Sequence, residues 1–244
     1  MRKYDVVLFD LDGTLTASKP GIIHCIRLAL DTYGVPYTEA QLEQMVGPPF
    51  VISMREILGV EDYDLILKMI DVYRGQYEID GWKECEIYDG IIELLKDLNA
   101  NGFRVALATS KPIKFSSIMI NGLGLAPYFE FLGGSLADSS NETKSDIINH
   151  ALDNMKITDK SRVLMVGDRL YDIVGAHKSG VDVAAVRWGY GNDEEFKKSA
   201  NLHSSADTLD SEYSFALNSP SKARSIILSS RYIILDDLTV TTTE

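Results

Sequence analysis

Five short apolar runs, separated by segments of helical pattern, constrain the fold of this chain more than any other feature. Each run has four to six residues, as is typical of strands buried on both faces of a parallel sheet. The runs span residues 6–9, 103–108, 128–132, 163–166 and 181–186, and the helical segments span 91–98, 113–120, 147–155 and 172–179. This alternation predicts an α/β fold with a doubly wound parallel sheet, in which a ligand binds beyond the carboxyl ends of the strands.

Residues 16–86 interrupt the alternation between the first and second runs. They contain no clear strand, and their apolar residues recur at helical spacing. Residues 38–41 match a capping box, which marks the start of a helix. We therefore predict a small α-helical cap domain at 16–86, inserted into a core that is formed by residues 1–15 and 87–217.

Residues 218–244 form a tail of different character. Two apolar runs, at 226–228 and 232–235, are separated by Ser-Ser-Arg and predict a hairpin. The last residues, 239–244, are predicted to fray. The sequence assigns this tail no function.

The overall charge is strongly acidic. The chain has 36 Asp and Glu residues against 24 Lys and Arg residues, a net charge of −12. This field repels a phosphate backbone, so we expect no nucleic-acid partner. It also repels an anionic small molecule, so a site for such a substrate needs cations of its own.

The cysteines and the amino-terminal segment indicate the cell compartment in which the protein is expected. Cys25 and Cys85 lie sixty residues apart, and no second Cys or His accompanies either at ligand spacing, so we expect free, reduced thiols. The first apolar run stops at Asp10, too early for a signal-peptide core, and no stretch reaches membrane-spanning length. We expect a cytoplasmic protein with no membrane partner, as a monomer or a weak homodimer.

Two carboxylates, Asp10 and Asp12, directly follow the first apolar run, and Gly13 comes next. Two acidic side chains at such a point are costly to bring together unless a cation or a proton stabilises them. Mg2+ prefers oxygen ligands and keeps positions open for phosphate and water. Gly13 permits a sharp turn that brings backbone N–H groups near an anion. A solvated turn is the simplest alternative; an EF-hand would need Gly where Leu15 stands, and a helix before it.

A second pair of carboxylates follows the fourth run. Asp168 comes after Gly167, and Asp172 falls in the first turn of the next helical segment. An N-cap role explains one of these two residues, but it does not explain both. Combined with Asp10, the pair indicates a metal site at the edge where neighbouring parallel strands end.

Two further segments supply groups that suit a phosphate. Thr109 and Ser110 end the second run just before Pro112, so their hydroxyl and N–H groups lie at a helix N-terminus. An ordinary cap is the alternative. Lys144 precedes another helical segment, and it is either solvated or the cation that balances the carboxylates.

In chain order, these motifs read Asp-x-Asp-Gly-Thr, Thr-Ser-Lys-Pro, Lys and Gly-Asp-x-x-x-Asp. This order resembles the haloacid-dehalogenase-like (HAD) hydrolase superfamily, and most closely its phosphoglycolate phosphatase and 5′-nucleotidase branch. Further similarity to that branch lies at residues 18–23, 46–49, 87–90, 134–136 and 188–191. The resemblance spans roughly residues 4–217, and it implies a Rossmann-like core.

The resemblance implies a phosphatase that acts through a phospho-aspartate at Asp10. Asp12 would protonate the leaving oxygen and then activate the hydrolytic water. Thr109 and Lys144 would stabilise the phosphoryl oxygens during transfer. The expected substrate is a small phosphorylated metabolite.

The resemblance also implies a Mg2+ ion as cofactor. Its ligands would be Asp10, Asp168 and the backbone carbonyl of Asp12, and Asp172 would orient the metal waters or Lys144.

Substrate contacts follow from the same resemblance. Gly13, Thr14 and Ser110 would bind the phosphoryl group in the core. The cap would close over the site as a lid, with hinges near 16–18 and 84–88, and would contribute Gly47 and, as a looser candidate, Arg27. Relatives in this branch often carry an arginine shortly before the motif lysine; residues 138–143 contain none, which leaves the substrate open.

Several functions stay open. A 5′-nucleotidase-like activity is slightly favoured by the cap motifs, and a phosphoglycolate phosphatase is the alternative. A sugar phosphomutase would keep every core motif. A receiver-type signalling module also uses a phospho-acceptor aspartate, but it needs no cap. A haloalkanoate dehalogenase would need neither Asp12 nor Mg2+ and is disfavoured.

Overall fold

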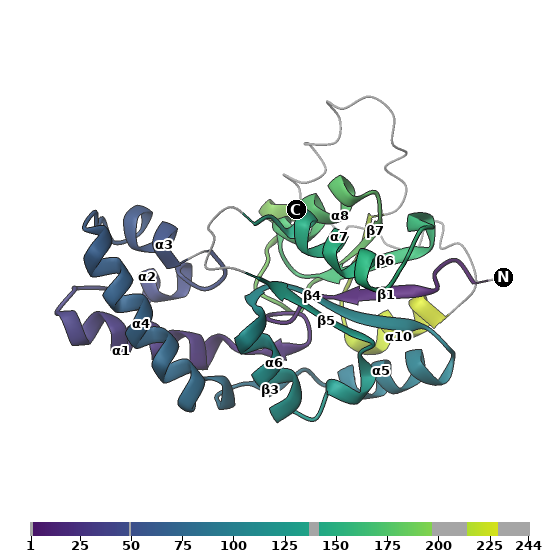
Figure 1. The fold of residues 1–244 in the computed structure, drawn as a ribbon, viewed down its shortest axis with the longest axis horizontal. Helices are drawn as coiled ribbons and strands as arrows, with labels where there is room; N and C mark the ends of the chain where they lie inside the picture. The colour runs from purple at the N-terminus through teal and green to yellow at the C-terminus, as the bar shows by residue number, and fades with distance from the viewer. Residues whose placement is uncertain (1, 49, 137–141, 197–213, 229–244) are drawn as a thin grey trace, which may run out of the picture.

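The computed structural model describes residues 2–48, 50–136, 142–196 and 214–228 (Figure 1). Six parallel strands form its main sheet in the order β5-β4-β1-β6-β7-β8. The strands are β1 (Val6–Phe9), β4 (Arg104–Pro112), β5 (Phe131–Ser135), β6 (Val163–Gly167), β7 (Asp182–Val186) and β8 (Ser214–Leu217). The predicted α/β fold with a doubly wound parallel sheet is confirmed.

Strand β1 is the point at which the winding of the sheet reverses. The chain runs from β1 outward through β4 to β5, then crosses to β6 on the other side of β1 and continues to β7 and β8. Val6 is in register with Arg104 on one side and with Val163 on the other. The carboxyl end of β1 is therefore the topological switch point, where sheets of this kind bind their ligands.

Helices cover both faces of the sheet (Figure 1). Helices α5 (Ile91–Ala100), α6 (Ile113–Gly122) and α10 (Pro220–Leu228) contribute to the core on one face, and α7 (Lys144–Asn154) and α8 (Leu170–Ser179) to the core on the other. Successive side chains of β1 alternate between these cores, and all four are at most 3% exposed. Burial of each contributes about 1.5–3 kcal/mol, which fixes the strand that precedes Asp10.

Four α-helices of the described residues lie between the short antiparallel strands β2 (Thr16–Ala17) and β3 (Glu86–Ile87). They are α1 (Lys19–Tyr33), α2 (Glu39–Gln44), α3 (Phe50–Glu56) and α4 (Tyr63–Ile79), and they gather beyond one end of the main sheet in Figure 1. The predicted capping box is confirmed, because Thr38 Oγ1 accepts from the N–H of Gln41, whose side chain accepts from the N–H of Thr38.

The predicted limits of the third run were wrong. The strand was predicted at 128–132, but β5 spans Phe131–Ser135. Ala126–Tyr128 forms a 3-10 turn around Pro127 instead. Gly133 and Gly134 lie inside this strand, where neighbouring atoms leave no room for a side chain. A Cβ on Gly133 would lie 2.7 Å from the Leu107 carbonyl oxygen.

The tail also differs from its prediction. Residues 226–228 are the end of helix α10, not a strand of a hairpin. Pro220 begins this helix, at the position where its missing N–H has no cost, and Ala223 and Ile227 are buried in the core. The second apolar run, at 232–235, lies outside the described residues. Strand β8 was not predicted.

Cys25 and Cys85 are both free, as predicted. Burial raises the pKa of Cys25 to about 12 and that of Cys85 to about 11, so both thiols stay protonated at neutral pH. No helix in the described residues is both long enough and apolar enough to cross a membrane.

Candidate active site

Asp10 lies at the carboxyl end of β1 and is paired with Lys144. Its backbone N–H donates to the carbonyl of Val166 over 2.9 Å, which extends the pairing of β1 with β6 by one residue. Lys144 Nζ lies 2.5 Å from Asp10 Oδ1 and 2.7 Å from Asp172 Oδ1. Lys144 is the first residue of α7, where the helix dipole opposes a positive charge, so these two carboxylates stabilise it there.

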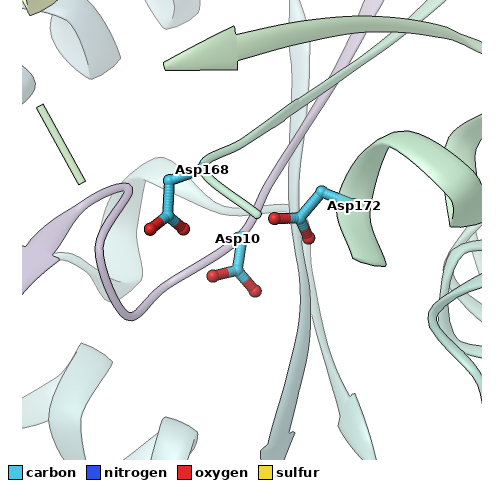
Figure 2. A group of neighbouring side chains, drawn as sticks. All are labelled: Asp10, Asp168 and Asp172. Carbon is cyan, nitrogen blue, oxygen red and sulfur yellow. The ribbon is translucent and has the colours of Figure 1, made fainter. Parts of the chain in front are cut away.

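Asp10, Asp168 and Asp172 form a compact acidic cluster (Figure 2). One carboxylate oxygen from each lies within 4.8 Å of the others, and all three residues are buried. They come from the end of β1, the end of β6 and the first turn of α8. Sequence reasoning placed these residues at one edge of the sheet, and the structure brings them together there.

The electrostatics of this cluster favour a bound cation. Burial raises the pKa of Asp10 to about 6 against the lowering effect of Lys144. Burial also raises the pKa of Asp168 to about 8, and the charges of Asp172 and Asp10 add to the effect. Lys144 pairs with two of the three carboxylates, Asp10 and Asp172. A divalent cation that prefers oxygen ligands complements this donor set, so the residues fit Mg2+.

Asp168 is held from several sides. Thr14 Oγ1 donates to its Oδ1 over 3.2 Å, and the backbone N–H of Tyr190 donates to its Oδ2 over 2.7 Å. A Cβ at Gly13 would lie 2.2 Å from Oδ2, and a Cβ at Gly189 would lie 2.4 Å from the Asp168 Cβ. Both glycines are needed for this close approach of the backbone.

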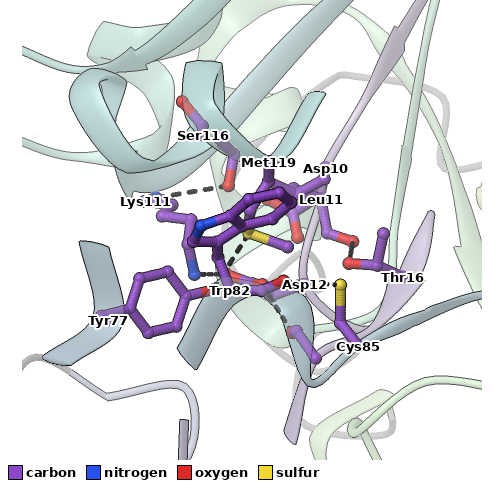
Figure 3. A network of polar contacts seen from close by, with 12 residues as sticks. Asp10, Leu11, Asp12, Thr16, Tyr77, Trp82, Cys85, Lys111, Ser116 and Met119 are labelled. Atoms are coloured by element: carbon purple, nitrogen blue, oxygen red, sulfur yellow. Dashed lines mark hydrogen bonds and ion pairs between the residues drawn. The ribbon is translucent and has the colours of Figure 1, made fainter. Parts of the chain in front are cut away.

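The side chain of Asp12 has hydrogen-bond partners that lie outside the acidic cluster, among them Lys111 (Figure 3). Lys111 Nζ donates to Asp12 Oδ2 over 2.8 Å, and Ser18 Oγ donates to Asp12 Oδ1 over 2.5 Å. The side chain is 21% exposed. The carboxylate of Asp12 is therefore not part of the acidic cluster of Asp10, Asp168 and Asp172.

Thr109 and Ser110 lie at an irregularity near the end of β4. The pairing of β4 with β5 shifts register between Thr109 and Pro112. Thr109 is buried, and its hydroxyl accepts from the N–H of Lys111 over 3.2 Å, while Ser110 is exposed. Because Phe9 is in register with Leu107, Thr109 lies at the same edge of the sheet as Asp10.

The structure places the two predicted contacts from residues 16–86 at different points, with Gly47 beside Arg169, the residue that follows Asp168. Gly47 has a φ of 111° and faces Arg169: a Cβ on this glycine would lie 2.0 Å from Arg169 Nη1. Arg27 forms an exposed ion pair with Glu39 over 2.9 Å.

Sequence reasoning gave no role to several residues around this site. Lys111 and Ser18 hold Asp12, and the hydroxyl of Tyr190 accepts from the N–H of Lys19 over 2.8 Å. Arg169 forms two 3.0 Å bonds to Glu195. Lys111 stood inside a quoted motif, so a signal was present, but its partner is 99 positions away.

A family comparison agrees with this geometry. The model of the family described as "Haloacid dehalogenase-like hydrolase" matches residues 7–186. The chain is 38% identical to the tyrosine-protein kinase PtkA of Mycobacterium tuberculosis over 84% of this chain and 70% of the relative. It is 32% identical to a 5′-nucleotidase of Pseudomonas aeruginosa over 84% of this chain and 92% of the relative. A phosphoglycolate phosphatase of Nitrosococcus oceani is 25% identical over 82% of this chain and 91% of the relative.

Solved structures show the same architecture. A putative phosphatase from Clostridium difficile matches with a TM-score of 0.80 and 34% identity, covering 93% of this chain and 100% of that one. The predicted resemblance is confirmed: the chain belongs to the haloacid-dehalogenase-like hydrolase family.

Proposed function

We propose that this protein is a Mg2+-dependent phosphatase that hydrolyses a small phosphorylated metabolite through a phospho-aspartate at Asp10. One observation carries the proposal. The buried Asp10 carboxylate lies at the switch point of the sheet, within 4.8 Å of two further carboxylates and 2.5 Å from Lys144. Such a cluster suits the binding of a phosphoryl group and a divalent cation together.

The first half-reaction transfers the phosphoryl group to the protein. An oxygen of Asp10 attacks phosphorus, a new O–P bond forms, and the bond from phosphorus to the leaving oxygen breaks. Asp12 gives its proton to that leaving oxygen, so the product departs as an alcohol. Lys144 and Thr109 stabilise the phosphoryl oxygens, and Ser110 orients the group. The predicted contacts from Gly13 and Thr14 are not retained, because their N–H groups donate to the carbonyls of Thr16 and Leu11 and the Thr14 hydroxyl donates to Asp168.

The second half-reaction regenerates the enzyme. Asp12, now ionised, takes a proton from a water molecule whose oxygen attacks phosphorus. The bond between Asp10 and phosphorus breaks, the carboxylate is restored, and inorganic phosphate leaves. One residue thus serves as acid and then as base.

The Asp10 and Asp168 side chains and the backbone carbonyl of Asp12 would hold the Mg2+ ion, and Asp172, which pairs with Lys144, would orient the metal waters or Lys144. When bound, the ion supplies positive charge that offsets the negative charge of the transferring group. Thr14 and the N–H of Tyr190 keep Asp168 oriented toward the cluster.

For the substrate, we favour a 5′-nucleotidase-like activity. Support comes from the 5′-nucleotidase relative, which matches over most of its length. Phosphoglycolate is the alternative, because relatives with that activity in their names also match. Residues 16–86 are proposed as the cap that selects between such leaving groups.

A tyrosine kinase is the second candidate function. It is favoured by the relative named tyrosine-protein kinase, at 38% identity. A kinase of this design would take the phosphoryl group from a nucleotide and pass it to a tyrosine hydroxyl instead of to water. The groups described around Asp10 suit either acceptor.

Phosphate release from a panel of substrates tests the proposal. The panel holds nucleoside monophosphates, phosphoglycolate, sugar phosphates, a phosphotyrosine peptide and p-nitrophenyl phosphate, each with Mg2+ or with EDTA. Mg2+-dependent release is the expected result, and the best substrate decides between the two phosphatase activities. Label transfer from ATP to a tyrosine peptide, without release from any panel member, would favour the kinase. A sugar bisphosphate intermediate would favour a mutase, and a long-lived phosphoprotein a signalling module.

A further inference from the structure

Lys111 is a buried lysine near the site, and the proposed mechanism gives it no role. It follows Thr109 and Ser110 near the end of β4, and its side chain is only 7% exposed. Its ammonium group lies between the Asp12 carboxylate and the ring of Tyr77. A buried charge is costly unless its partner is fixed. The position of that partner is therefore informative.

The partner of Lys111 is Asp12. Lys111 Nζ lies 2.8 Å from Asp12 Oδ2 (Figure 3). The hydroxyl of Ser18 lies 2.5 Å from the other carboxylate oxygen, Oδ1. Both oxygens of Asp12 are thus held, one by the core and one by the segment that enters α1. Proton transfer to a leaving oxygen depends on correct placement of the donor within hydrogen-bond reach.

Besides Asp12, Lys111 also contacts a helix that lies between β2 and β3 in the chain. Lys111 Nζ lies 4.4 Å from the ring centroid of Tyr77 on α4. Tyr77 is itself buried, and its hydroxyl donates to Met119 Sδ over 3.0 Å. On the other side, the hydroxyls of Ser18 and Tyr190 lie 3.3 Å apart.

We infer that Lys111 is a positioning residue that holds the Asp12 carboxylate for proton transfer and, through its contact with Tyr77, makes that placement depend on the packing of helix α4. This inference rests on the proposed function, because it concerns the residue that serves there as acid and base. Lys111 itself touches no reacting atom in this account. It acts through the position of Asp12.

Two other roles for Lys111 make different predictions. If the lysine bound an anionic group of the substrate, its loss would raise KM only for substrates that carry a second anion, such as phosphoglycolate. If it were merely structural, its loss would lower activity equally for all substrates. A positioning role instead makes the loss depend on how much the leaving group needs a proton.

The experiment compares Lys111→Met with the wild-type protein on two leaving groups. The nitrophenolate of p-nitrophenyl phosphate departs without a proton, while the alkoxide from an alkyl phosphate requires one. We expect Lys111→Met to lower kcat/KM by about a hundredfold for the best alkyl phosphate of the panel and by no more than about threefold for p-nitrophenyl phosphate. Asp12→Asn should show the same pattern.

Lys114→Met is the matched control. Lys114 lies three positions after Lys111, in the first turn of α6. It also reaches α4, through an ion pair with Glu78 over 2.6 Å, but its side chain is 62% exposed. It makes no contact with Asp12 among the interactions described. Its loss should leave both substrates unchanged.

A double variant keeps the test decisive if Lys111→Met unfolds because Asp12 loses its buried partner. Asp12→Asn/Lys111→Met removes both charges together. Its activity on p-nitrophenyl phosphate should equal that of Asp12→Asn alone, because Lys111 acts only through Asp12. A further loss in the double variant would overturn the inference.

The remaining outcomes separate this inference from the proposed function. An equal loss for both leaving groups, or a rise in KM limited to phosphoglycolate, would overturn the positioning role while the phosphatase stands. A wild-type protein that releases phosphate from no substrate would overturn the proposed function and this inference with it.

Discussion

The ammonium group of Lys144 lies 2.5 Å from the Asp10 carboxylate, although 134 positions separate them in sequence. The same nitrogen lies 2.7 Å from Asp172. One lysine therefore links the strand end that carries the proposed nucleophile with the helix that carries Asp172, the third carboxylate of the cluster. Its loss should affect both the stability of the fold and the response to Mg2+.

Replacing Lys144 by Met leaves two buried carboxylates without their partner. We expect the free energy of unfolding in EDTA to fall by about 3–5 kcal/mol, and activity to be lost. Because Mg2+ would supply positive charge at the same cluster, it should raise the Tm of this variant more than that of the wild type. Lys160→Met, which removes an exposed lysine paired with Asn149, is the control and should change stability by less than about 0.5 kcal/mol. An equal Mg2+ response in wild type and Lys144→Met would contradict the account.

Gly13→Ala tests the close approach of the Asp10–Gly13 turn to Asp168. The added Cβ would lie 2.2 Å from Asp168 Oδ2, and the φ of Gly13 is 86°. Gly34→Ala is a matched control: Gly34 also has a positive φ, 65°, but a Cβ there meets no atom within 4 Å. Both variants should pay about 1 kcal/mol for the left-handed backbone. Only Gly13→Ala should also lose Mg2+ binding, measured by calorimetry, and retention of wild-type affinity would contradict the proposed site.

The sequence predicted the acidic cluster because its elements obey a simple geometric rule. Asp10 and Asp168 each follow an apolar run, and the carboxyl ends of neighbouring parallel strands meet at one edge. This prediction depended only on the first and fourth apolar runs being neighbouring strands of the sheet. Asp172 followed from the first turn of the next helical segment, and Lys144 was singled out because the carboxylates otherwise lacked a cation to balance them.

The partners of Asp12 could not be predicted in the same way. Lys111 and Ser18 come from a strand end with shifted register and from the entry to α1, and no periodic pattern reports where such segments meet. The predicted limits of β5 were wrong for a related reason. Gly133 and Gly134 weaken a strand pattern, and only the close packing against β4 explains why they are in the strand.

Asp5 lies away from the site, and its ion pairs should make the stability of the fold depend on pH. A hydrogen bond from Arg162 and a second from Arg2 lower the pKa of its carboxyl from 3.8 to about 2. A lowered folded-state pKa contributes stability above pH 4 that is lost as the pH falls from 4 to 2. Asp5→Asn should therefore reduce the urea midpoint at pH 7, and most of this difference should be gone near pH 2, where the folded-state carboxyl is half protonated. A gap of equal size at both pH values would show that the ion pairs are not responsible.

Arg169 joins the loop after β6 to residues 46 and 47. It forms two 3.0 Å bonds to Glu195, and its Nη1 donates to the carbonyl of Val46 over 3.3 Å. If residues 16–86 close over the substrate, Arg169→Met should raise KM by about tenfold, since such bonds contribute about 1.5–3 kcal/mol. Arg187→Met, which breaks a more exposed pair with Asp193, should leave KM unchanged. A KM of Arg169→Met that matches the wild type would argue against a cap that docks through this residue.

The most direct test of the central claim is to trap the phosphoryl group on Asp10. The protein is mixed with Mg2+ and its best substrate, quenched with acid during turnover, and reduced with borohydride, which converts an aspartyl phosphate to homoserine. Mass spectrometry of the peptide that contains Asp10 and Asp12 then locates the change. A phospho-aspartate at Asp10 predicts homoserine at position 10, and none in EDTA or in Asp10→Asn. Rapid phosphate release with Asp10 unmodified, or homoserine at position 12 instead, would contradict it.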